Sequence, residues 1–291
     1  MDTLVRAVAD NAQIRAFATV TRDMTETARA AHNTSPVVTA ALGRLMTGAV
    51  MMGSMLGEAD ELLTLQVDGD GHVGRMVVTA DGQGNVKGYA ANPQAMCPAS
   101  AAGKLDVGRI VGNGYLTVMK DMGLEEPYNS RIALVSGEIG DDLAQYFASS
   151  EQVPSGVGLG VLMNKDNTVK CAGGFIIQLM PFASDECVSR LENALSKITS
   201  VTALLDKGLD PEGLLRAILS DTDVEITDTR TIAFKCNCTR NRVERVLLSM
   251  GRDQLEELIN EGEDVELNCQ FCNSHYIFSP QEIKELLVSA R

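Results

Sequence analysis

Four cysteines near the end of the chain are the residues whose types and spacing best support chemistry. Cys236-Asn-Cys238 is followed, after thirty residues, by Cys269-Gln-Phe-Cys272. Two close pairs separated by a helix-sized insert can bring four sulfurs to the corners of a tetrahedron, the geometry of closed structural zinc sites, with S–Zn distances of about 2.3 Å. The sequence therefore predicts one Zn²⁺ ion held by the thiolates of Cys236, Cys238, Cys269 and Cys272.

Other uses of these cysteines agree less well with the spacing. A c-type haem site needs His directly after the C-x-x-C pair, where Asn273 stands. A thioredoxin-like motif would open a helix after a strand, whereas residues 265–269 and 275–278 predict two short strands that flank the pair. His275 could replace one sulfur, giving a site of three cysteines and one histidine, and it stays as the alternative ligand.

The length and the net charge of the chain limit its number of domains and its classes of binding partner. A chain of 291 residues is long enough for one large domain and something smaller. Its 45% hydrophobic and 22% charged residues are typical of a globular protein. A net charge of −14 argues against binding to nucleic acid or to an anionic membrane, since either would repel the surface.

The chain carries two signals that bear on its compartment. Its start, Met1-Asp2-Thr3-Leu4, lacks the basic and apolar regions of a signal peptide, and its seven cysteines predict a reducing cytosol where thiols stay free or bind metal. Residues 36–57 are apolar enough to resemble a membrane span, but their glycines and Arg44 favour a buried helix. We therefore expect a cytoplasmic protein without a membrane partner.

The first 180 residues predict an antiparallel α+β domain. Short β-branched runs separated by turn dipeptides indicate a meander over residues 62–90, with hairpins over residues 4–20 and 157–179. Helices are expected at residues 25–32, 37–56 and 141–149, so strands and helices are interspersed without the alternation of a doubly wound fold. We assign residues 1–180 to this domain.

A helical linker and a small module are expected to follow. Apolar residues recur along one face of residues 186–205, and Asp210-Pro211 opens a further helix, before a polar connector over residues 221–231. We therefore assign residues 181–231 to an amphipathic helical linker and residues 232–291 to the zinc module. Within that module two short helices separate the cysteine pairs, and a capping box at Ser279 opens a final helix.

The chain is similar to a known family, the heat shock protein 33 family of redox-regulated holdase chaperones. The resemblance covers essentially the whole chain in the expected order. It rests on the cysteine pairs and on three further stretches: Ala41-Leu42-Gly43-Arg44, Ser149-Ser150-Glu151-Gln152-Val153-Pro154 and Gly173-Gly174-Phe175-Ile176-Ile177-Gln178-Leu179-Met180-Pro181. It implies a compact N-terminal domain for client binding and dimerisation, a linker lying on that domain, and a C-terminal redox switch.

The resemblance also implies a mechanism. Oxidation would convert the zinc ligands to the disulfides Cys236–Cys238 and Cys269–Cys272, release zinc, unfold switch and linker, and expose a surface that binds unfolding proteins during oxidative and heat stress without ATP. The implied partners are unfolded clients, a second copy when oxidised, and ATP-driven chaperones that take clients over. From the residues alone, four cysteines allow three pairings, and spacing does not choose among them.

Two other functions remain as alternatives. A zinc-ribbon nucleic-acid binder could use the basic residues Lys235, Arg240, Arg242 and Arg245, and a thiol–disulfide oxidoreductase could use one reactive cysteine. We find no Ser/His/Asp set, paired carboxylate site or nucleotide loop, so we predict no enzyme activity and no catalytic residue. The other cysteines, Cys97, Cys171 and Cys187, show no pairing pattern and are expected to be small apolar residues.

Overall fold

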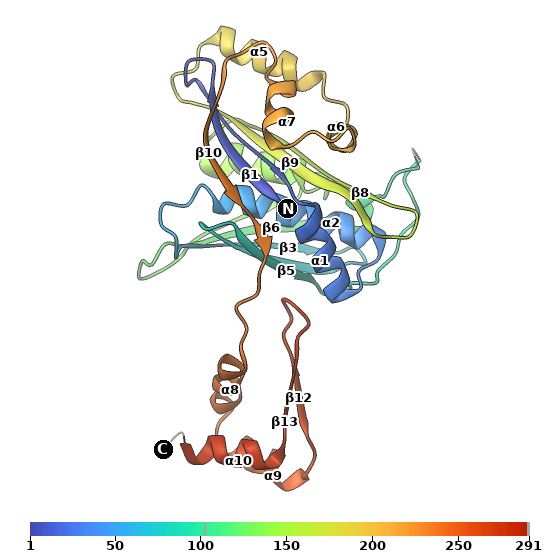
Figure 1. Cartoon of the computed structure of the whole chain (residues 1–291), viewed down its shortest axis with the longest axis vertical. Helices are drawn as coiled ribbons and strands as arrows, with labels where there is room; N and C mark the ends of the chain where they lie inside the picture. The colour runs from blue at the N-terminus through green and yellow to red at the C-terminus, as the bar shows by residue number, and fades with distance from the viewer. Residues whose placement is uncertain (102, 290–291) are drawn as a thin grey trace. The chain divides into compact units, whose positions relative to one another are not determined.

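The computed structural model describes residues 1–101 and 103–289 and comprises two compact units, residues 1–235 and 236–291 (Figure 1). The first unit contains two sheets that are antiparallel except for one short parallel strand. The first sheet has the strand order β10-β1-β2-β9-β8. Its strands are β1 (Thr3–Ala9), β2 (Ile14–Val20), β8 (Ser155–Met163), β9 (Val169–Leu179) and β10 (Val224–Thr231). The predicted α+β class is confirmed.

The second sheet contains the predicted meander. Its order is β11-β5-β4-β3-β6-β7, and only the pairing of β11 with β5 is parallel. The strands are β3 (Leu62–Gly69), β4 (Arg75–Asp81), β5 (Asn85–Ala90), β6 (Gly114–Asp121), β7 (Tyr128–Ala133) and β11 (Ala233–Phe234). Buried and half-buried residues alternate along β3, β4 and β5, as expected for strands with one face in a core.

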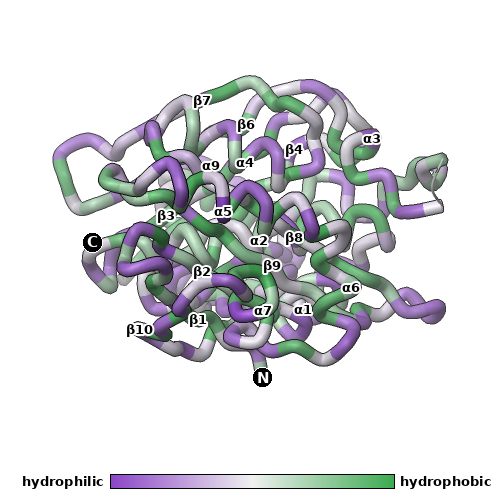
Figure 2. Tube along the Cα trace, turned by 90° about the horizontal axis from the view of Figure 1, so that it is seen from above, coloured by the Kyte–Doolittle hydropathy of each residue, from purple (hydrophilic) through white to green (hydrophobic). Residues whose placement is uncertain are grey.

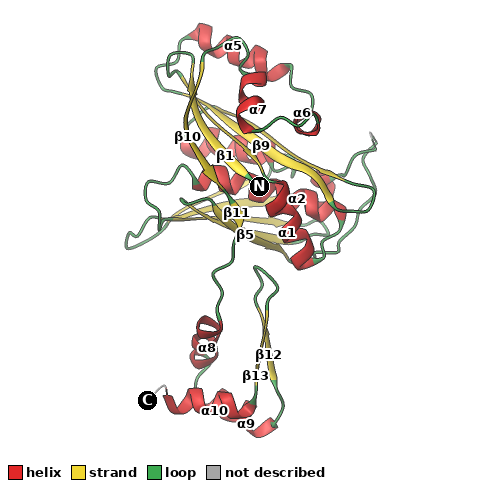
Figure 3. Cartoon of the chain, viewed as in Figure 1, coloured by secondary structure: helices red, strands yellow, loops and turns green. Residues whose placement is uncertain are grey.

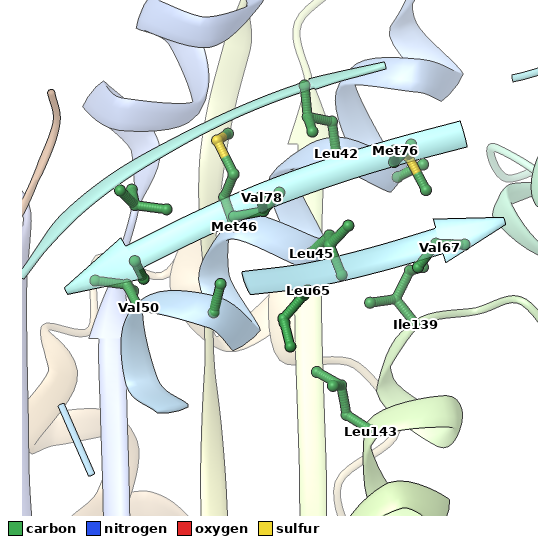
Figure 4. Close-up of a cluster of buried hydrophobic side chains, with 14 of the residues drawn as sticks. Leu42, Leu45, Met46, Val50, Leu65, Val67, Met76, Val78, Ile139 and Leu143 are labelled. Atoms are coloured by element: carbon green, nitrogen blue, oxygen red, sulfur yellow. The ribbon is translucent and has the colours of Figure 1, made fainter. Parts of the chain in front are cut away.

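Helix α2 (Pro36–Gly53) forms the centre of the first unit, where it contacts strands of both sheets. Ser35 caps its N-terminus by accepting a hydrogen bond from the backbone N–H of Val38, and Pro36 fits the first turn. Leu42, Leu45 and Met46 of this helix point toward side chains of β3 and β4 (Figure 4). The helix is long and apolar enough to cross a membrane, but 89% of its apolar window is buried inside the protein. It is therefore a core helix, as predicted.

Shorter helices complete the core around α2. They are α1 (Arg22–His32), α3 (Val107–Val111) and α4 (Gly140–Tyr146), which continues into the π-helical turn η1 (Phe147–Glu151). The carboxylate of Asp142 is buried and accepts hydrogen bonds from backbone N–H groups of residues 135, 136 and 139. These bonds fix the loop that leads into α4.

The linker helices lie on the outer face of the first sheet (Figure 3). They are α5 (Asp185–Ser196), α6 (Val201–Asp206) and α7 (Pro211–Ile218). The expectation of one helix over residues 186–205 is wrong, because the first helix ends at Ser196 and a second helix begins at Val201. Ser200 starts a new helix there, with its hydroxyl accepting a hydrogen bond from the N–H of Ala203.

The end of the linker is also different from the expectation. The predicted polar connector contains β10, which pairs with β1 from Thr3 opposite Thr231 to Ala9 opposite Val224. Half-buried and exposed residues alternate along β10. This strand lies beside β1 in the trace coloured by hydropathy (Figure 2). This segment is therefore an edge strand of the first sheet, in addition to being a connection.

The second unit has its own small core. Its elements are α8 (Arg240–Ser249), α9 (Arg252–Glu261), β12 (Val265–Asn268), β13 (His275–Phe278) and α10 (Pro280–Ser289). The two helices between the cysteine pairs, the two flanking strands and the final helix are all as predicted. Its fully buried apolar side chains are Leu247, Leu255, Phe278 and Ile283, which is a small core for a unit of this length.

Candidate metal centre

The four cysteines of the second unit lie together. Their four Sγ atoms all lie within 4.8 Å of one another, and each of the cysteines is half-buried. The Sγ atoms of Cys236 and Cys269 are 3.7 Å apart, and those of Cys238 and Cys272 are 3.2 Å apart. The structure thus brings together all four residues that the sequence predicts as metal ligands.

Local structure explains how each pair is held. Cys236 and Cys238 lie in the irregular segment just before α8, whose N-terminus is capped by the hydroxyl of Thr239. Cys269 and Cys272 lie in the tight turn that joins β12 to β13. In that turn the N–H of Cys269 donates to the carbonyl of Ser274 at 2.9 Å, and Asn273 adopts the left-handed conformation at φ 56°. Asn tolerates this conformation better than most residues, so this turn can fold around two inward-facing sulfurs.

Two polar side chains contact the sulfurs from outside. The hydroxyl of Tyr276 donates a hydrogen bond to Sγ of Cys238 at 3.2 Å, and the hydroxyl of Ser274 lies 3.2 Å from Sγ of Cys272. Neither contact is predicted from the sequence. The position of Ser274, two residues after a ligand, offered a signal, whereas Tyr276 is brought to the other cysteine pair only by the fold. Such outer partners orient metal ligands and adjust their reactivity.

Crowding shifts the pKa values of the thiols in different directions. Burial, together with neighbouring thiols, raises the pKa of Cys236 to about 12, and burial also raises the pKa of Cys269. Burial opposes ionisation of Cys272 as well, but its contacts with Ser274 and the adjacent thiols lower its pKa to about 7. A divalent cation among the sulfurs would favour the thiolate at all four positions.

The donor set fits zinc. Sulfurs at the corners of a tetrahedron with S–Zn distances of about 2.3 Å lie about 3.8 Å apart. The Sγ–Sγ separations of 3.2 and 3.7 Å are close to this value. Four thiolate ligands are typical of Zn²⁺ and of iron–sulfur centres, and calcium and magnesium prefer oxygen. The chemistry of the donors therefore matches the predicted ion.

The alternative ligand lies outside this cluster. Nδ1 of His275 is 2.6 Å from a carboxylate oxygen of Glu266, and within the described residues the metal-ligating group contains the four cysteines alone. The other three cysteines belong to the first unit. Cys187 is buried, and burial and its hydrogen bond with Asp10 raise its pKa to about 11, whereas Cys97 and Cys171 are half-buried. Their surroundings agree with the small apolar role expected for them.

The basic residues near the cysteines are partly engaged within the second unit. The guanidinium of Arg240 donates to the carbonyl of Ile277 at 3.0 Å, pairs with Glu282 at 2.7 Å, and lies over the ring of Phe278. This arginine therefore ties α8 to the final hairpin and helix. Its engagement weakens the basic cluster on which a nucleic-acid-binding function would depend.

Comparisons with known proteins agree along the whole chain. Residues 2–279 match the family model described as "Hsp33 protein". The 33 kDa chaperonin of Lachnoclostridium phytofermentans is 54% identical to the chain, over 98% of this chain and 98% of the relative. The 33 kDa chaperonin of Agathobacter rectalis is 52% identical, over 98% of this chain and 99% of the relative. The crystal structure of the 33 kDa chaperonin, a heat shock protein 33 homologue, from Thermotoga maritima is similar with a TM-score of 0.92 and 35% identity over 99% of this chain and 98% of that one. The chain therefore belongs to the heat shock protein 33 family of chaperones.

Proposed function

We propose that this chaperone is a cytoplasmic, ATP-independent holdase that is switched on by oxidation of its four clustered cysteines. In the reduced form Cys236, Cys238, Cys269 and Cys272 hold one zinc ion, which keeps the second unit folded. In the oxidised form the protein binds unfolding clients, dimerises, and later passes clients to ATP-driven chaperones. The cluster of four Sγ atoms within 4.8 Å is the observation that carries this proposal.

The chemistry of the switch follows from the thiolates. Zinc itself is not redox-active, but it keeps its ligands deprotonated, and the thiolate is the form that peroxide or hypochlorous acid attacks. With peroxide, one thiolate is first oxidised to a sulfenic acid, and a second thiolate then displaces hydroxide to form an S–S bond. Formation of each disulfide thus transfers two electrons from two thiolates to one peroxide, whose oxygens leave as two hydroxide ions that take up protons from the solvent to become water. Oxidised ligands can no longer coordinate the ion.

Loss of the ion would unfold the second unit. Among the residues that the structure describes, four fully buried apolar side chains form its core. A structural zinc site supplies roughly 10–16 kcal/mol of apparent folding free energy, whereas whole domains are stable by about 5–15 kcal/mol. The metal therefore decides whether this unit is folded.

The linker provides the surface to be exposed. Leu191, Leu205, Leu214, Leu215 and Ile218 of α5–α7 are buried against apolar residues of β1, β2 and β9. The chain runs from these helices through β10 and β11 directly to Cys236. If unfolding of the second unit destabilises that connection, apolar surface opens on both the helices and the sheet. Such surface attracts unfolded chains with about 25 cal/mol per Å² buried.

One experiment tests the switch. The reduced protein is treated with peroxide at heat-shock temperature, while zinc release and suppression of aggregation of a denatured client are followed together. We expect both to rise with the same time course, and we expect the C97S/C171S/C187S triple variant to behave like the parent. A reduced protein without bound zinc, or equal protection of clients in both redox states, would refute the proposal.

A further inference from the structure

A cavity in the first unit brings charged and apolar side chains together. Its volume is about 130 Å³. Charged and polar side chains of β2, β6, β9 and η1 line it, together with apolar side chains that include Met52, Met55 and Phe147. Apolar pockets with a few convergent polar groups are typical small-molecule sites, and those for drug-sized ligands measure about 300–1,000 Å³. The size of this cavity therefore limits its ligand to a smaller molecule.

Two of the charged groups that line the cavity neutralise each other. The ammonium group of Lys120 is paired with the carboxylate of Glu151, which also accepts a hydrogen bond from the hydroxyl of Tyr146. Burial opposes ionisation of Glu151, but its contacts with Lys120 and Tyr146 lower its pKa, so that it is a carboxylate at neutral pH. Lys120 and Glu151 thus contribute no net charge to the cavity.

The third charged group, the guanidinium of Arg15, is half-buried and forms no ion pair among the described residues. Its Nε and Nη2 atoms donate hydrogen bonds to the amide oxygen of Gln178 at 3.2 and 2.6 Å. Gln178 is 1% exposed, and its amide nitrogen donates to the hydroxyl of Ser155 at 3.0 Å, so a buried amide holds the guanidinium in place. Burial and the charge of Arg6 lower the pKa of Arg15, and the charge of Glu151 offsets this only in part. A half-buried cation is screened little by solvent ions, so an anion beside Arg15 would be stabilised.

We propose that this cavity binds a small monocarboxylate with an apolar body, and that its carboxylate pairs with Arg15. A guanidinium presents its N–H donors in two forks, each of which matches the two oxygens of a carboxylate. Gln178 accepts from the fork formed by Nε and Nη2. The other fork, formed by Nη1 and the second N–H of Nη2, has no partner among the described residues and is the group that receives the ligand.

The lining of the cavity determines the rest of the ligand. One unpaired cation matches one carboxylate and leaves a second carboxylate without a partner. Met52, Met55 and Phe147 offer apolar contacts, and the thioether sulfur of methionine makes favourable contacts with aromatic rings. An aromatic monocarboxylate therefore fits the lining best. This site goes beyond the proposed chaperone function, and it depends on neither zinc nor oxidation.

Three small molecules test the two parts of the proposed ligand. Benzoate carries one carboxylate on one aromatic ring. Benzamide has nearly the same shape without the charge, and acetate has the charge without the ring. We expect benzoate to bind at least tenfold more tightly than either, because benzamide lacks the ion pair with Arg15 and acetate lacks the apolar contacts.

Binding is measured by NMR on the full chain in its reduced, purified state, with ¹³C-labelled methionine methyl groups. We expect benzoate to shift the methyl signals of Met52 and Met55 along a saturable curve. The signal of Met250, an exposed residue of the second unit, should not move. The position of the shifted signals thus identifies the cavity as the site.

Variants of Arg15 test its role directly. Arg15→Leu removes the cation and should weaken benzoate binding at least tenfold, to the level of benzamide. Arg15→Lys keeps the charge without the fork and should bind benzoate more tightly than Arg15→Leu does. Arg109→Leu, at an exposed position of α3, is the matched control and should bind like the parent. If Arg15→Leu does not fold, the comparison of benzoate with benzamide on the parent protein still decides.

Four results would overturn the proposal. They are shifts that do not saturate, equal binding of benzoate and benzamide, equal binding of benzoate and acetate, and parent-like binding by Arg15→Leu. The third result would mean that the cavity takes any small anion, without selecting an apolar body. None of these measurements involves zinc release or client aggregation, so failure here is distinguishable from failure of the redox switch.

Discussion

The hydroxyl of Tyr276 donates a hydrogen bond to Sγ of Cys238, which links β13 to a sulfur of the other cysteine pair. Hydrogen bonds to a thiolate stabilise its negative charge and reduce its nucleophilicity. The same bond holds the sulfur in place for a metal ion. The stability of the cluster and its rate of oxidation are thus coupled through one tyrosine.

Removing this hydroxyl should sensitise the switch. We expect Tyr276→Phe to weaken zinc binding by about 10-fold, the lower end for loss of an outer partner of a metal ligand, and to accelerate peroxide-driven zinc release. A chromogenic zinc chelator measures both. Tyr115→Phe, at an exposed position on β6, should leave release unchanged. Parent-like release from Tyr276→Phe would show that the hydrogen bond has no such role.

A glycine of β8, Gly158, lies close to side chains of both β9 and the linker helix α6. A Cβ at Gly158 would lie 2.4 Å from Cε1 of Phe175 and 2.9 Å from Cγ2 of Val201 in α6. We expect Gly158→Ala to cost about 1–3 kcal/mol through overpacking, and to loosen the linker while zinc stays bound. The reduced variant should therefore bind a hydrophobic dye and suppress client aggregation more than the parent does.

The control for this prediction is Gly140→Ala, because the nearest atom to a Cβ there is the carbonyl oxygen of Val157 at 3.7 Å. This variant should show neither dye binding nor increased activity. A Gly158→Ala protein that is destabilised but binds no dye when reduced would contradict the role of the linker as a cover.

Acid should weaken the attachment of α5. The carboxylate of Asp10 is hydrogen-bonded with Cys187 and paired with Arg190 at 2.6 Å, and these contacts lower its pKa. A lowered pKa in the folded state means that stabilisation is complete above the unfolded pKa of about 3.9 and is lost as the pH falls through the folded value. We therefore expect Asp10→Asn to reduce the free energy of unfolding by about 1–2 kcal/mol at pH 7.

The difference between parent and Asp10→Asn should begin to shrink as the pH falls below about 4, where Asp10 of the unfolded chain becomes protonated, and should disappear once the pH is below the lowered folded pKa, where Asp10 is protonated in both states. Urea unfolding between pH 3 and pH 7 measures it. Asp206→Asn removes a more exposed pair with Lys170 and should cost less than about 1 kcal/mol at any pH. A constant difference across this range would assign the effect to something other than ionisation of Asp10.

Proximity of the sulfurs does not by itself decide the disulfide pairing. The 3.2 and 3.7 Å contacts join cysteines from different pairs, Cys238 with Cys272 and Cys236 with Cys269. In a four-thiolate cluster, however, all sulfurs are nearly equidistant. Following the family resemblance, we expect Cys236–Cys238 and Cys269–Cys272 in the oxidised protein. Peptide mapping by mass spectrometry without reduction distinguishes these from the crossed pairs, whose detection as the main product would overturn the expectation.

The cysteine cluster and the local hairpins could be predicted because their determinants are local. The C-x-x-C pair lies in a turn between two strands of four residues, and the meander from β3 to β5 uses short turns whose dipeptides are visible in the sequence. The core helix α2 was equally evident from its apolar composition. In each case neighbouring residues determine the conformation.

The errors concern long-range pairing and a helix break. β10 carries charges and threonines, and it becomes a strand because β1, at the opposite end of the chain, offers it an edge. The apolar stripe over residues 186–205 continues through the break after Ser196, because α5 and α6 bury their apolar faces against the same sheet. The spacing of apolar residues alone therefore did not reveal that the helix is interrupted. The local signal of a new helix start was Ser200, a residue type that caps helix N-termini.

The pairing of β1 with β10 has a consequence for synthesis of the protein. β1 is made long before β10, the strand that covers its outer edge and that begins only at residue 224, just ahead of the cysteine module. Until residues 224–231 have been made, the nascent sheet is bounded on that side by β1. A member of a chaperone family thus carries an exposed strand edge of its own until β10 has been made.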